Sequence, residues 1–157
     1  SDCPSSWLTV NTSSTPAQTC YKIYSTQSQT FDGAASFCNS QGGYLARETS
    51  AIVHAGLKPN VIAESIAHPN TNFWIGLTDN NTNGQWVWVG GPTVGTYRNF
   101  GNRNSGGSRN RRDCGYVSVC NDFRWRTTTN CNQTNAFICQ RDLTAPPLAT
   151  TTPRKSD

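Results

Sequence analysis

The cysteine content is the feature that most constrains the fold of this chain. Seven cysteines occur in 157 residues, at Cys3, Cys20, Cys38, Cys114, Cys120, Cys131 and Cys139. Zinc sites typically use close pairs such as Cys-x2-Cys together with further Cys or His ligands. The sequence has no Cys-x2-Cys pair, and its two histidines, His54 and His68, lie far along the chain from any cysteine. The pattern therefore favours disulfide bonds and an extracellular, oxidising location.

The composition agrees with a secreted or ectodomain glycoprotein. Only 34% of the residues are apolar and 14% are charged, with 13 Gly and 8 Pro, which predicts a loop-rich domain whose stability depends partly on covalent links. Sequons for N-glycosylation begin at Asn11, Asn80 and Asn132. No apolar run approaches the ~18 residues of a membrane span, so no membrane insertion is expected in this chain. It contains no signal peptide, which suggests a mature or trimmed fragment.

The composition changes sharply near the C-terminal end. Residues 1–142 are expected to form one folded unit, and residues 143–157 form a Thr/Pro-rich linker or tail. Such a stretch cannot build a core and favours an extended structure. Two interpretations stay open: a disordered end, or a linker to a further domain or a membrane stalk.

Hydrophobic periodicity predicts two helices. One begins after the N-cap Thr30 and ends at Gly42-Gly43. The other begins near Thr49 or Ser50 and is expected to break at Pro59, with residues 61–66 forming another turn. Short β-rich runs predict strands at 21–24, 73–77, 86–89, 116–119 and 136–140. The long aperiodic segment 90–113 is expected to be functional or disordered, with a mobile tip at 101–108.

Several motifs agree with one another in order and spacing. They are Cys3-Pro4-Ser5-Ser6-Trp7, Cys20-Tyr21, Gly43-Tyr44-Leu45-Ala46, Phe73-Trp74-Ile75-Gly76-Leu77, Gln85-Trp86-Val87-Trp88-Val89-Gly90-Gly91, Asp113-Cys114, Trp125 with Cys131, and Phe137-Ile138-Cys139. With these motifs, residues 1–141 resemble a C-type lectin-like domain of the long form. The resemblance implies an α+β fold with two helices, two small antiparallel sheets, a long ligand-binding loop and three disulfides. We expect the tryptophans of the central motifs to be structural rather than a sugar platform.

The resemblance also implies how the cysteines pair. The family pattern gives the bridges Cys3–Cys20, Cys38–Cys139 and Cys114–Cys131. Cys120 is left over, which leaves three options: a free buried thiol, a disulfide-linked dimer with a second chain, or a rearranged set of bridges.

The calcium residues of the sugar-binding members are not found at the matching positions. Those members use a Glu-Pro-Asn or Gln-Pro-Asp triplet in the long loop, a Glu two residues before the matching cysteine, and a Trp-Asn-Asp triplet. Here the same positions hold Asn102-Arg103-Asn104, Arg112 and Trp125-Arg126-Thr127. Because calcium needs several anionic oxygen ligands, we expect no cofactor at the usual site. A calcium site displaced to Asp113, Asn121 and Asp122 stays an alternative.

Arginines gather on the part of the chain that the family uses for ligands. The stretch 98–126 holds seven arginines, no lysine and two aspartates. An arginine fork binds sulfate, phosphate or carboxylate bidentately, whereas lysine acts as a point charge. The predicted ligand-binding residues are Arg98, Asn102, Arg103, Asn104, Arg109, Arg111, Arg112, Arg124 and Arg126. A solvated loop, with arginine serving only solubility, is the plainer interpretation.

These observations favour a recognition module over an enzyme. Neither histidine has a catalytic motif around it, and no nucleophile elbow, zinc-protease or phosphate-loop motif is present. The expected partners are glycans, acidic ones favoured, or a cell-surface or secreted protein; an extracellular chain gives no reason to expect nucleic acid. The alternatives are a protein-binding or adhesion module of the same fold, and a calcium-dependent lectin with displaced ligands.

Overall fold

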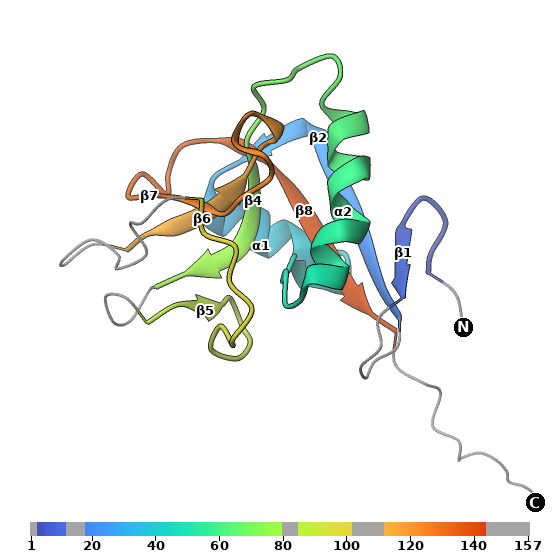
Figure 1. Cartoon of the computed structure of the whole chain (residues 1–157), viewed down its shortest axis with the longest axis horizontal. Helices are drawn as coiled ribbons and strands as arrows, with labels where there is room; N and C mark the ends of the chain where they lie inside the picture. The colour runs from blue at the N-terminus through green and yellow to red at the C-terminus, as the bar shows by residue number, and fades with distance from the viewer. Residues whose placement is uncertain (1–2, 12–17, 80–84, 102–111, 144–157) are drawn as a thin grey trace, which may run out of the picture.

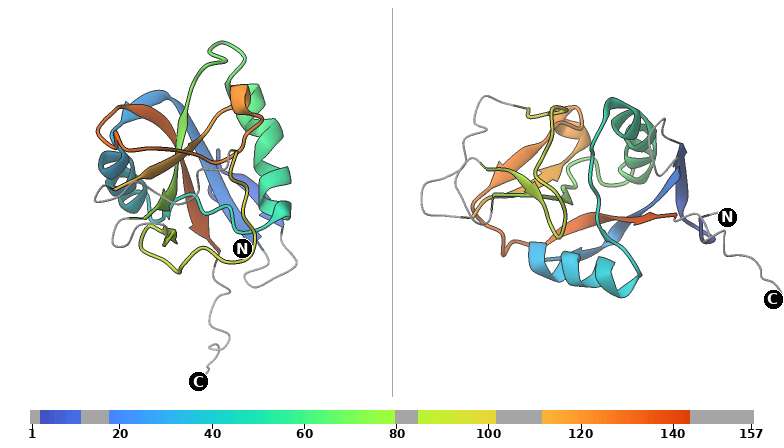
Figure 2. Two further views of the ribbon diagram at one scale, coloured as in Figure 1. Left: turned by 60° about the vertical axis from the view of Figure 1, so that its left-hand side comes forward. Right: turned by 90° about the horizontal axis from the view of Figure 1, so that it is seen from below.

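A computed structural model describes residues 3–11, 18–79, 85–101 and 112–143 of the chain. Within these ranges the strands hydrogen-bond into one mixed sheet, with a helix against each of its two faces (Figures 1 and 2). The helices are α1 (Phe31–Ser40) and α2 (Ala51–Glu64), and a short 3-10 helix, η1, spans Val119–Asn121. The strands are β1 (Leu8–Asn11), β2 (Gln18–Gln29), β3 (Tyr44–Leu45), β4 (Phe73–Thr78), β5 (Val87–Trp88), β6 (Cys114–Val117), β7 (Arg126–Thr128) and β8 (Asn135–Asp142).

The sheet is continuous and mixed, where two small antiparallel sheets were expected. Its order is β1-β2-β8-β4-β6-β7, with β3 added to β8 and β5 added to β4. The two halves are joined where β4 and β8 run parallel, with Phe73 opposite Ala136 and Trp74 opposite Phe137. The chain between β4 and β8 passes through β5, β6 and β7, and a connection of this length permits a parallel pairing that a tight hairpin cannot make.

Helix α1 forms where the sequence predicted it. The Thr30 hydroxyl accepts a hydrogen bond from the Gly33 N–H at 3.1 Å, and Asp32 lies in the first turn, where a negative charge favours the helix dipole. Its inner face buries Phe31, Ala34 and Cys38 against the sheet. Beyond the last turn, Gly42 takes a φ of 85°, the left-handed conformation that terminates many helices.

The prediction that Pro59 breaks the second helix is wrong. Helix α2 runs unbroken from Ala51 to Glu64, capped by the Ser50 hydroxyl. Proline removes one hydrogen bond to the carbonyl four residues earlier, which here belongs to Ala55. Both residues lie on the exposed side of the helix, where water can solvate that carbonyl. Burial of Val53, Leu57 and Val61 on the opposite side holds the helix together across the proline.

The strand predictions are correct in place but not in length. The run predicted at 116–119 is split, because β6 covers Cys114–Val117 and η1 begins at Val119. The run predicted at 86–89 narrows to Val87–Trp88. The sequence analysis missed β1, β3 and β7, which have only two to four residues each and carry too short a pattern to detect.

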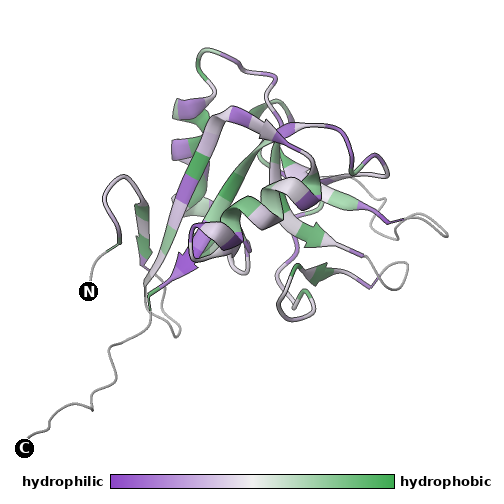
Figure 3. Cartoon of the chain, turned by 180° about the vertical axis from the view of Figure 1, so that it is seen from behind, coloured by the Kyte–Doolittle hydropathy of each residue, from purple (hydrophilic) through white to green (hydrophobic). Residues whose placement is uncertain are grey.

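Two hydrophobic cores lie on the two faces of the sheet. The α1 side contains Phe31, Trp74 and Phe137 (Figure 3, in which α1 lies in front). The α2 side packs Leu57 and Val61 with a group of aromatic residues that includes Trp86, Trp88, Phe123 and Trp125. The tryptophans of the central motifs, Trp74, Trp86 and Trp88, are therefore core residues with exposures of 0–2%.

Three disulfides form with the pairing that the family resemblance implies. They are Cys3–Cys20, Cys38–Cys139 and Cys114–Cys131. Cys120 is a free thiol, exposed rather than buried, with its Sγ 3.1 Å from the Pro69 carbonyl oxygen. A link from Cys120 to a second chain stays a prediction.

Two further expectations concern the termini and the sequons. Asn11 and Asn132 are exposed, so both asparagines are accessible to modification. Asn80, the loop tip and the Thr/Pro tail from residue 144 onward lie outside the described residues. Within the described ranges, neither helix has the length and apolarity required to cross a bilayer.

Replacing Pro59 with alanine should stabilise the fold. Pro59→Ala restores an N–H for the Ala55 carbonyl and removes the ring clash, while it loses some rigidity of the unfolded chain. We expect the free energy of unfolding to rise by about 1–2 kcal/mol, measured by chemical denaturation. An unchanged or lower stability would show that the proline ring makes a stabilising contact in α2.

The Cys38–Cys139 and Cys114–Cys131 disulfides should differ in how much each stabilises the fold. Cys38–Cys139 closes a loop of sequence separation 101, whereas Cys114–Cys131 closes one of 17. Replacing each pair with alanine should cost about 4–5 and about 3 kcal/mol respectively, because the longer loop constrains the unfolded chain more. Denaturation of the two double variants tests this, and an equal loss would contradict the loop-length account.

Candidate functional site

Two segments of the arginine-rich region, residues 98–101 and 124–126, lie side by side. The Trp125 N–H donates to the Asn99 carbonyl at 2.8 Å, and the Gly101 N–H donates to the Trp125 carbonyl at 2.8 Å. A parallel β-bridge joins Phe100 and Trp125. A Cβ at Gly101 would lie 3.0 Å from the Arg124 Cβ, so glycine is what allows this close approach. The backbone thus brings residues 98–101 and 124–126 onto one surface.

Trp125 connects this surface to the α2-side core. Its indole is fully buried and packs edge-on against Trp88 at 5.3 Å, Phe100 at 5.1 Å and Tyr97 at 6.0 Å between ring centroids. Such edge-to-face pairs each contribute about 0.5–1.5 kcal/mol beyond burial of their area. The segment 97–101 is therefore held onto the core by aromatic packing.

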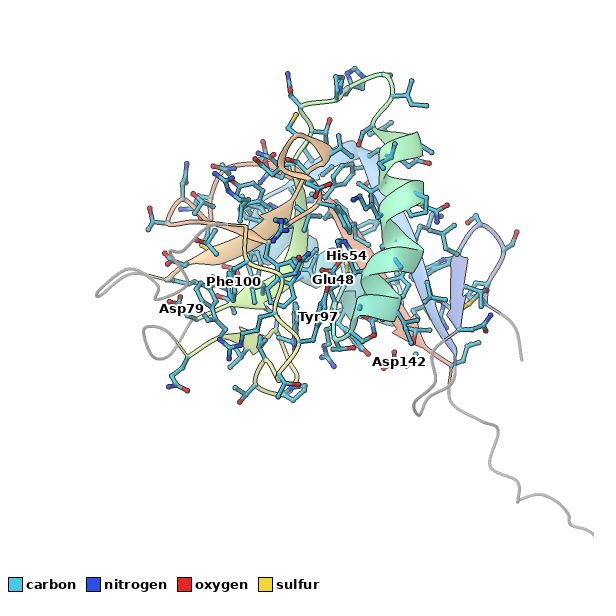
Figure 4. All side chains as sticks on the ribbon, in the orientation of Figure 1. Glu48, His54, Asp79, Tyr97, Phe100 and Asp142 are labelled. Atoms are coloured by element: carbon cyan, nitrogen blue, oxygen red, sulfur yellow. A yellow bond between two sulfur atoms is a disulfide. The ribbon has the colours of Figure 1, made fainter. Side chains whose placement is uncertain are left out.

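A buried glutamate lies under the same surface. Glu48 is 2% exposed, and its Oε1 accepts hydrogen bonds from the Trp125 Nε1–H at 2.6 Å and from the Asn99 side-chain amide at 3.3 Å. Its Oε2 lies 3.2 Å from Nδ1 of His54, which comes from α2. Figure 4 labels Glu48 and His54 beside α2, with Tyr97 and Phe100 on the neighbouring segment. We call Glu48, His54, Asn99 and Trp125 the loop-stem network.

The turn that leads into Trp125 is held in a strained conformation. Asp122 and Phe123 both have a φ of 57°, the left-handed region, which costs about 1–3 kcal/mol per non-glycine residue. The Asn99 amide donates to the Phe123 carbonyl at 3.2 Å, and Lys58 bonds the Asp122 carboxylate at 2.9 Å. That hydrogen bond from Lys58 is the main reason that the pKa of Asp122 lies below its usual value. The surrounding contacts therefore fix the backbone just before Arg124.

Two of the predicted arginines are exposed and unpaired. Arg98 and Arg124 are both on the surface, and neither forms an ion pair within the part of the chain that the structure describes. The Arg98 Nε–H donates to the Gly95 carbonyl at 3.3 Å. Arg126 is half-buried and donates to the Asn121 side chain at 3.1 Å. We call Arg98, Arg124 and Arg126 the arginine face.

Arg112 has a different environment from the other predicted arginines. Its two terminal nitrogens each lie 2.9 Å from an oxygen of Asp32, and its guanidinium lies 5.0 Å over the Phe31 ring. This hydrogen bond is the largest cause of the lowered pKa of Asp32. The guanidinium of Arg112 is therefore already bound bidentately to a carboxylate. The other five predicted ligand residues, Asn102, Arg103, Asn104, Arg109 and Arg111, lie outside the described residues.

Tyr97 is a site residue that the sequence analysis missed. Its ring is half-buried beside the arginine face, and burial, together with the nearby Glu48 charge, raises the pKa of its hydroxyl to about 12, against the lowering effect of Arg124. The phenol is thus neutral at physiological pH. Glu48, His54 and Asn99 were missed as well, because no local pattern marks a polar residue that becomes buried only through contacts distant in sequence.

The described residues do not fit the calcium site of the family. Two of the positions that would supply acidic or amide oxygens hold Arg112 and Arg126, and both guanidiniums are cations with protein partners. Of the displaced site, Asp122 is paired with Lys58 and the Asn121 side-chain oxygen accepts from Arg126; calcium binding there stays an alternative. Asp79 and Asp113 are buried close together. Within the described ranges, however, no three His, Cys, Asp or Glu side chains gather as metal ligands.

Comparisons with known proteins decide the family. The model of the Lectin C-type domain matches residues 27–141. The chain belongs to the C-type lectin domain family. It is 31% identical over 143 residues to "Snaclec stejaggregin-A subunit alpha" of Trimeresurus stejnegeri, covering 88% of this chain and 81% of that protein. It is 25% identical over 138 residues to "Perlucin-like protein" of Mytilus galloprovincialis, covering 88% and 82%.

A solved structure agrees with this assignment. The chain superposes on the mouse scavenger receptor C-type lectin carbohydrate-recognition domain with a TM-score of 0.65 and 25% identity, covering 90% of this chain and 98% of that one. The family is one of recognition domains rather than enzymes. The α+β fold and the three disulfides expected from the resemblance are thereby confirmed.

The Asp32–Arg112 pair should give a small, pH-dependent contribution to stability. Because the pKa of folded Asp32 is below its ordinary value of 3.8, this contribution is present above that pH and is lost as the pH falls through the lowered pKa. Asp32 is 72% exposed, so Asp32→Asn should lower stability at pH 7 by no more than about 1 kcal/mol.

Denaturation of the wild type and Asp32→Asn across acidic and neutral pH tests this sign. The stability difference between them should shrink as the solution becomes more acid than the ordinary pKa of Asp32. A difference that grows on acidification would contradict the pairing.

Proposed function

We propose that this protein is an extracellular or secreted glycan-recognition module that binds anionic glycans through its arginines, without the calcium bridge. The observation that carries the proposal is the pair of exposed arginines, Arg98 and Arg124, which form no ion pair within the described ranges and lie beside a half-buried Tyr97. Arg126 extends this surface.

The chemistry of these side chains suits a sulfated or carboxylated sugar. A guanidinium presents two parallel N–H donors to a sulfate or carboxylate, and charge-assisted hydrogen bonds are about twice as strong as neutral ones. The neutral Tyr97 ring offers an apolar surface with a hydroxyl at its edge, which suits a sugar ring. The remaining predicted residues, Asn102, Arg103, Asn104, Arg109 and Arg111, would extend the binding surface along the same loop.

Family membership supports sugar as the ligand class. The mouse relative of known structure is named as a carbohydrate-recognition domain. The replacement of acidic calcium-ligand positions by Arg112 and Arg126 supports binding through positive charge instead of a metal. Arg112 is proposed to contribute less than the exposed arginines, because Asp32 already occupies its guanidinium.

A protein-binding role is the second candidate, and one surface favours it. Ile62 in the last turn of α2 and Ile66 just beyond the helix are exposed at 45% and 79%, and exposed apolar side chains that gather in a patch mark interaction surfaces. The exposed thiol of Cys120 contacts Pro69, a few residues beyond Ile66. A secreted protein partner or a disulfide-linked second copy would cover this surface.

Arginine variants test the proposed function. Binding to immobilised heparin should persist in chelator and weaken as salt rises, because salt screens exposed charges. Arg124→Lys keeps the charge but loses the fork, and we expect affinity to fall about tenfold, a loss of about 1.4 kcal/mol. Arg98→Lys should behave similarly. Arg141→Gln, at the C-terminal end of β8, is the control, with affinity changed less than about twofold.

Three other results would contradict the proposed function. Unchanged affinity of Arg98→Lys and Arg124→Lys, together with a small loss for Arg141→Gln, would indicate diffuse charge rather than bidentate recognition. Binding to neutral sugars that disappears in chelator would replace the proposal with a calcium-dependent site. Absence of binding across a glycan array would favour the second candidate, a protein-binding role.

A further inference from the structure

The hydrogen-bond donors and acceptors of the loop-stem network match one another in only one arrangement. Asn99 Nδ2 lies within hydrogen-bonding distance of three atoms: Glu48 Oε1 at 3.3 Å, the Phe123 carbonyl oxygen at 3.2 Å and His54 Nδ1 at 3.2 Å. The amide has two hydrogens. Turning the amide over would place its oxygen against Glu48 Oε1 and the Phe123 carbonyl, both of which are only acceptors. The amide nitrogen therefore faces this group and donates to these two oxygens.

This assignment determines the protonation of His54. Its Nδ1 lies 3.2 Å from Glu48 Oε2, which in a carboxylate can only accept. Since both amide hydrogens of Asn99 are already used, Nδ1 has no need to accept from the amide. Nδ1 must then carry a hydrogen and donate it to Glu48. The Glu48 carboxylate thus receives hydrogen bonds from Trp125, Asn99 and His54, which come from three separate parts of the chain.

The network spans the elements that carry the proposed binding residues. Asn99 directly follows Arg98, and Trp125 stands between Arg124 and Arg126. His54 is on α2, and its ring packs 5.3 Å from the ring of Phe123 in the strained turn. Glu48 precedes α2 and is bonded to all three partners. One carboxylate, that of Glu48, thus accepts hydrogen bonds from both segments of the arginine face, through Asn99 and through Trp125.

We propose that Glu48 and His54, in its Nδ1–H form, are positioning residues that hold the arginine face in its binding geometry. The proposal rests on the function proposed above, and it adds one buried and one half-buried residue, neither of which touches a ligand. Glu48 replaces the water that would otherwise solvate the Trp125 and Asn99 donors, and a buried donor left without an acceptor is costly. Without Glu48, these donors would be drawn toward water, and the segments 98–101 and 124–126 would separate.

Two substitutions at Glu48 separate a positioning role from simple filling of the core. Glu48→Gln keeps an oxygen for the Trp125 and Asn99 donors, but its amide nitrogen then faces His54. Nδ1 must accept in that variant, so the imidazole should change to the Nε2–H tautomer. Glu48→Leu removes every acceptor while it retains an apolar side chain of similar size. Glu64→Gln, at the end of α2, removes a negative charge outside the network and serves as the matched control.

The first readout requires no ligand. Nitrogen-15 NMR of the histidine side chains should show Nδ1 of His54 protonated in the wild type and the tautomer change in Glu48→Gln. Hydrogen exchange should show the backbone amides of Gly101 and Trp125 protected in the wild type and in both Gln variants, but not in Glu48→Leu. A wild-type His54 with an unprotonated Nδ1, or unchanged protection in Glu48→Leu, would overturn the proposal.

The second readout is affinity for immobilised heparin in chelator. We expect Glu48→Leu to lose at least about tenfold, a change of about 1.4 kcal/mol, with all arginines intact, while Glu48→Gln recovers most of the wild-type affinity. Equal affinities of Glu48→Leu and the wild type would overturn the positioning role. If the wild type does not bind heparin, the proposed function is wrong. The NMR and hydrogen-exchange results still test whether Glu48 and His54 hold the two segments together. If Glu48→Leu does not fold, His54→Leu, which removes one donor at a partly exposed position, replaces it in both measurements under the same criteria.

Discussion

The hydrogen bond from the Trp125 indole to the buried Glu48 carboxylate is the contact on which the proposed binding surface depends. It connects the aromatic core on the α2 side of the sheet to the segment that carries Arg124. The same carboxylate reaches Asn99 and His54, so both ends of the described loop region meet at one buried charge. A buried carboxylate is stable only when donors surround it. The rigidity of the exposed surface is thus a consequence of satisfying a charge in the interior.

Arginines that look equivalent in the sequence have different environments in the fold. Arg112 and Arg124 both belong to the basic stretch and look equivalent in the sequence. In the fold, Asp32 at the start of α1 pairs with Arg112, whereas Arg124 forms no ion pair within the described ranges and lies near Tyr97. The number of arginines therefore overstates how many of them can bind an anionic ligand. A guanidinium is available only where no carboxylate from another element already pairs with it.

The features predictable from the sequence are those set by local or covalent constraints. Thr30 and the glycines after Ser40 bound α1 as expected, and the family motifs gave the three disulfide pairs. The prediction for α2 failed because Pro59 disfavours a helix locally, while burial of Leu57 and Val61 against distant strands favours it. Glu48 could not have been recognised, since its partners lie 6, 51 and 77 residues away in the sequence.

The most direct test of the central claim, that exposed arginines recognise anionic sugars without a metal, is NMR detection of the arginine side chains. The Nε–H resonances would be followed while a sulfated, heparin-derived disaccharide is added in the presence of chelator. The account predicts that the Arg98 and Arg124 resonances shift together with the ring signals of Tyr97, while Arg112, bound to Asp32, moves little. Shifts confined to other arginines, or shifts that occur only after calcium is restored, would contradict it.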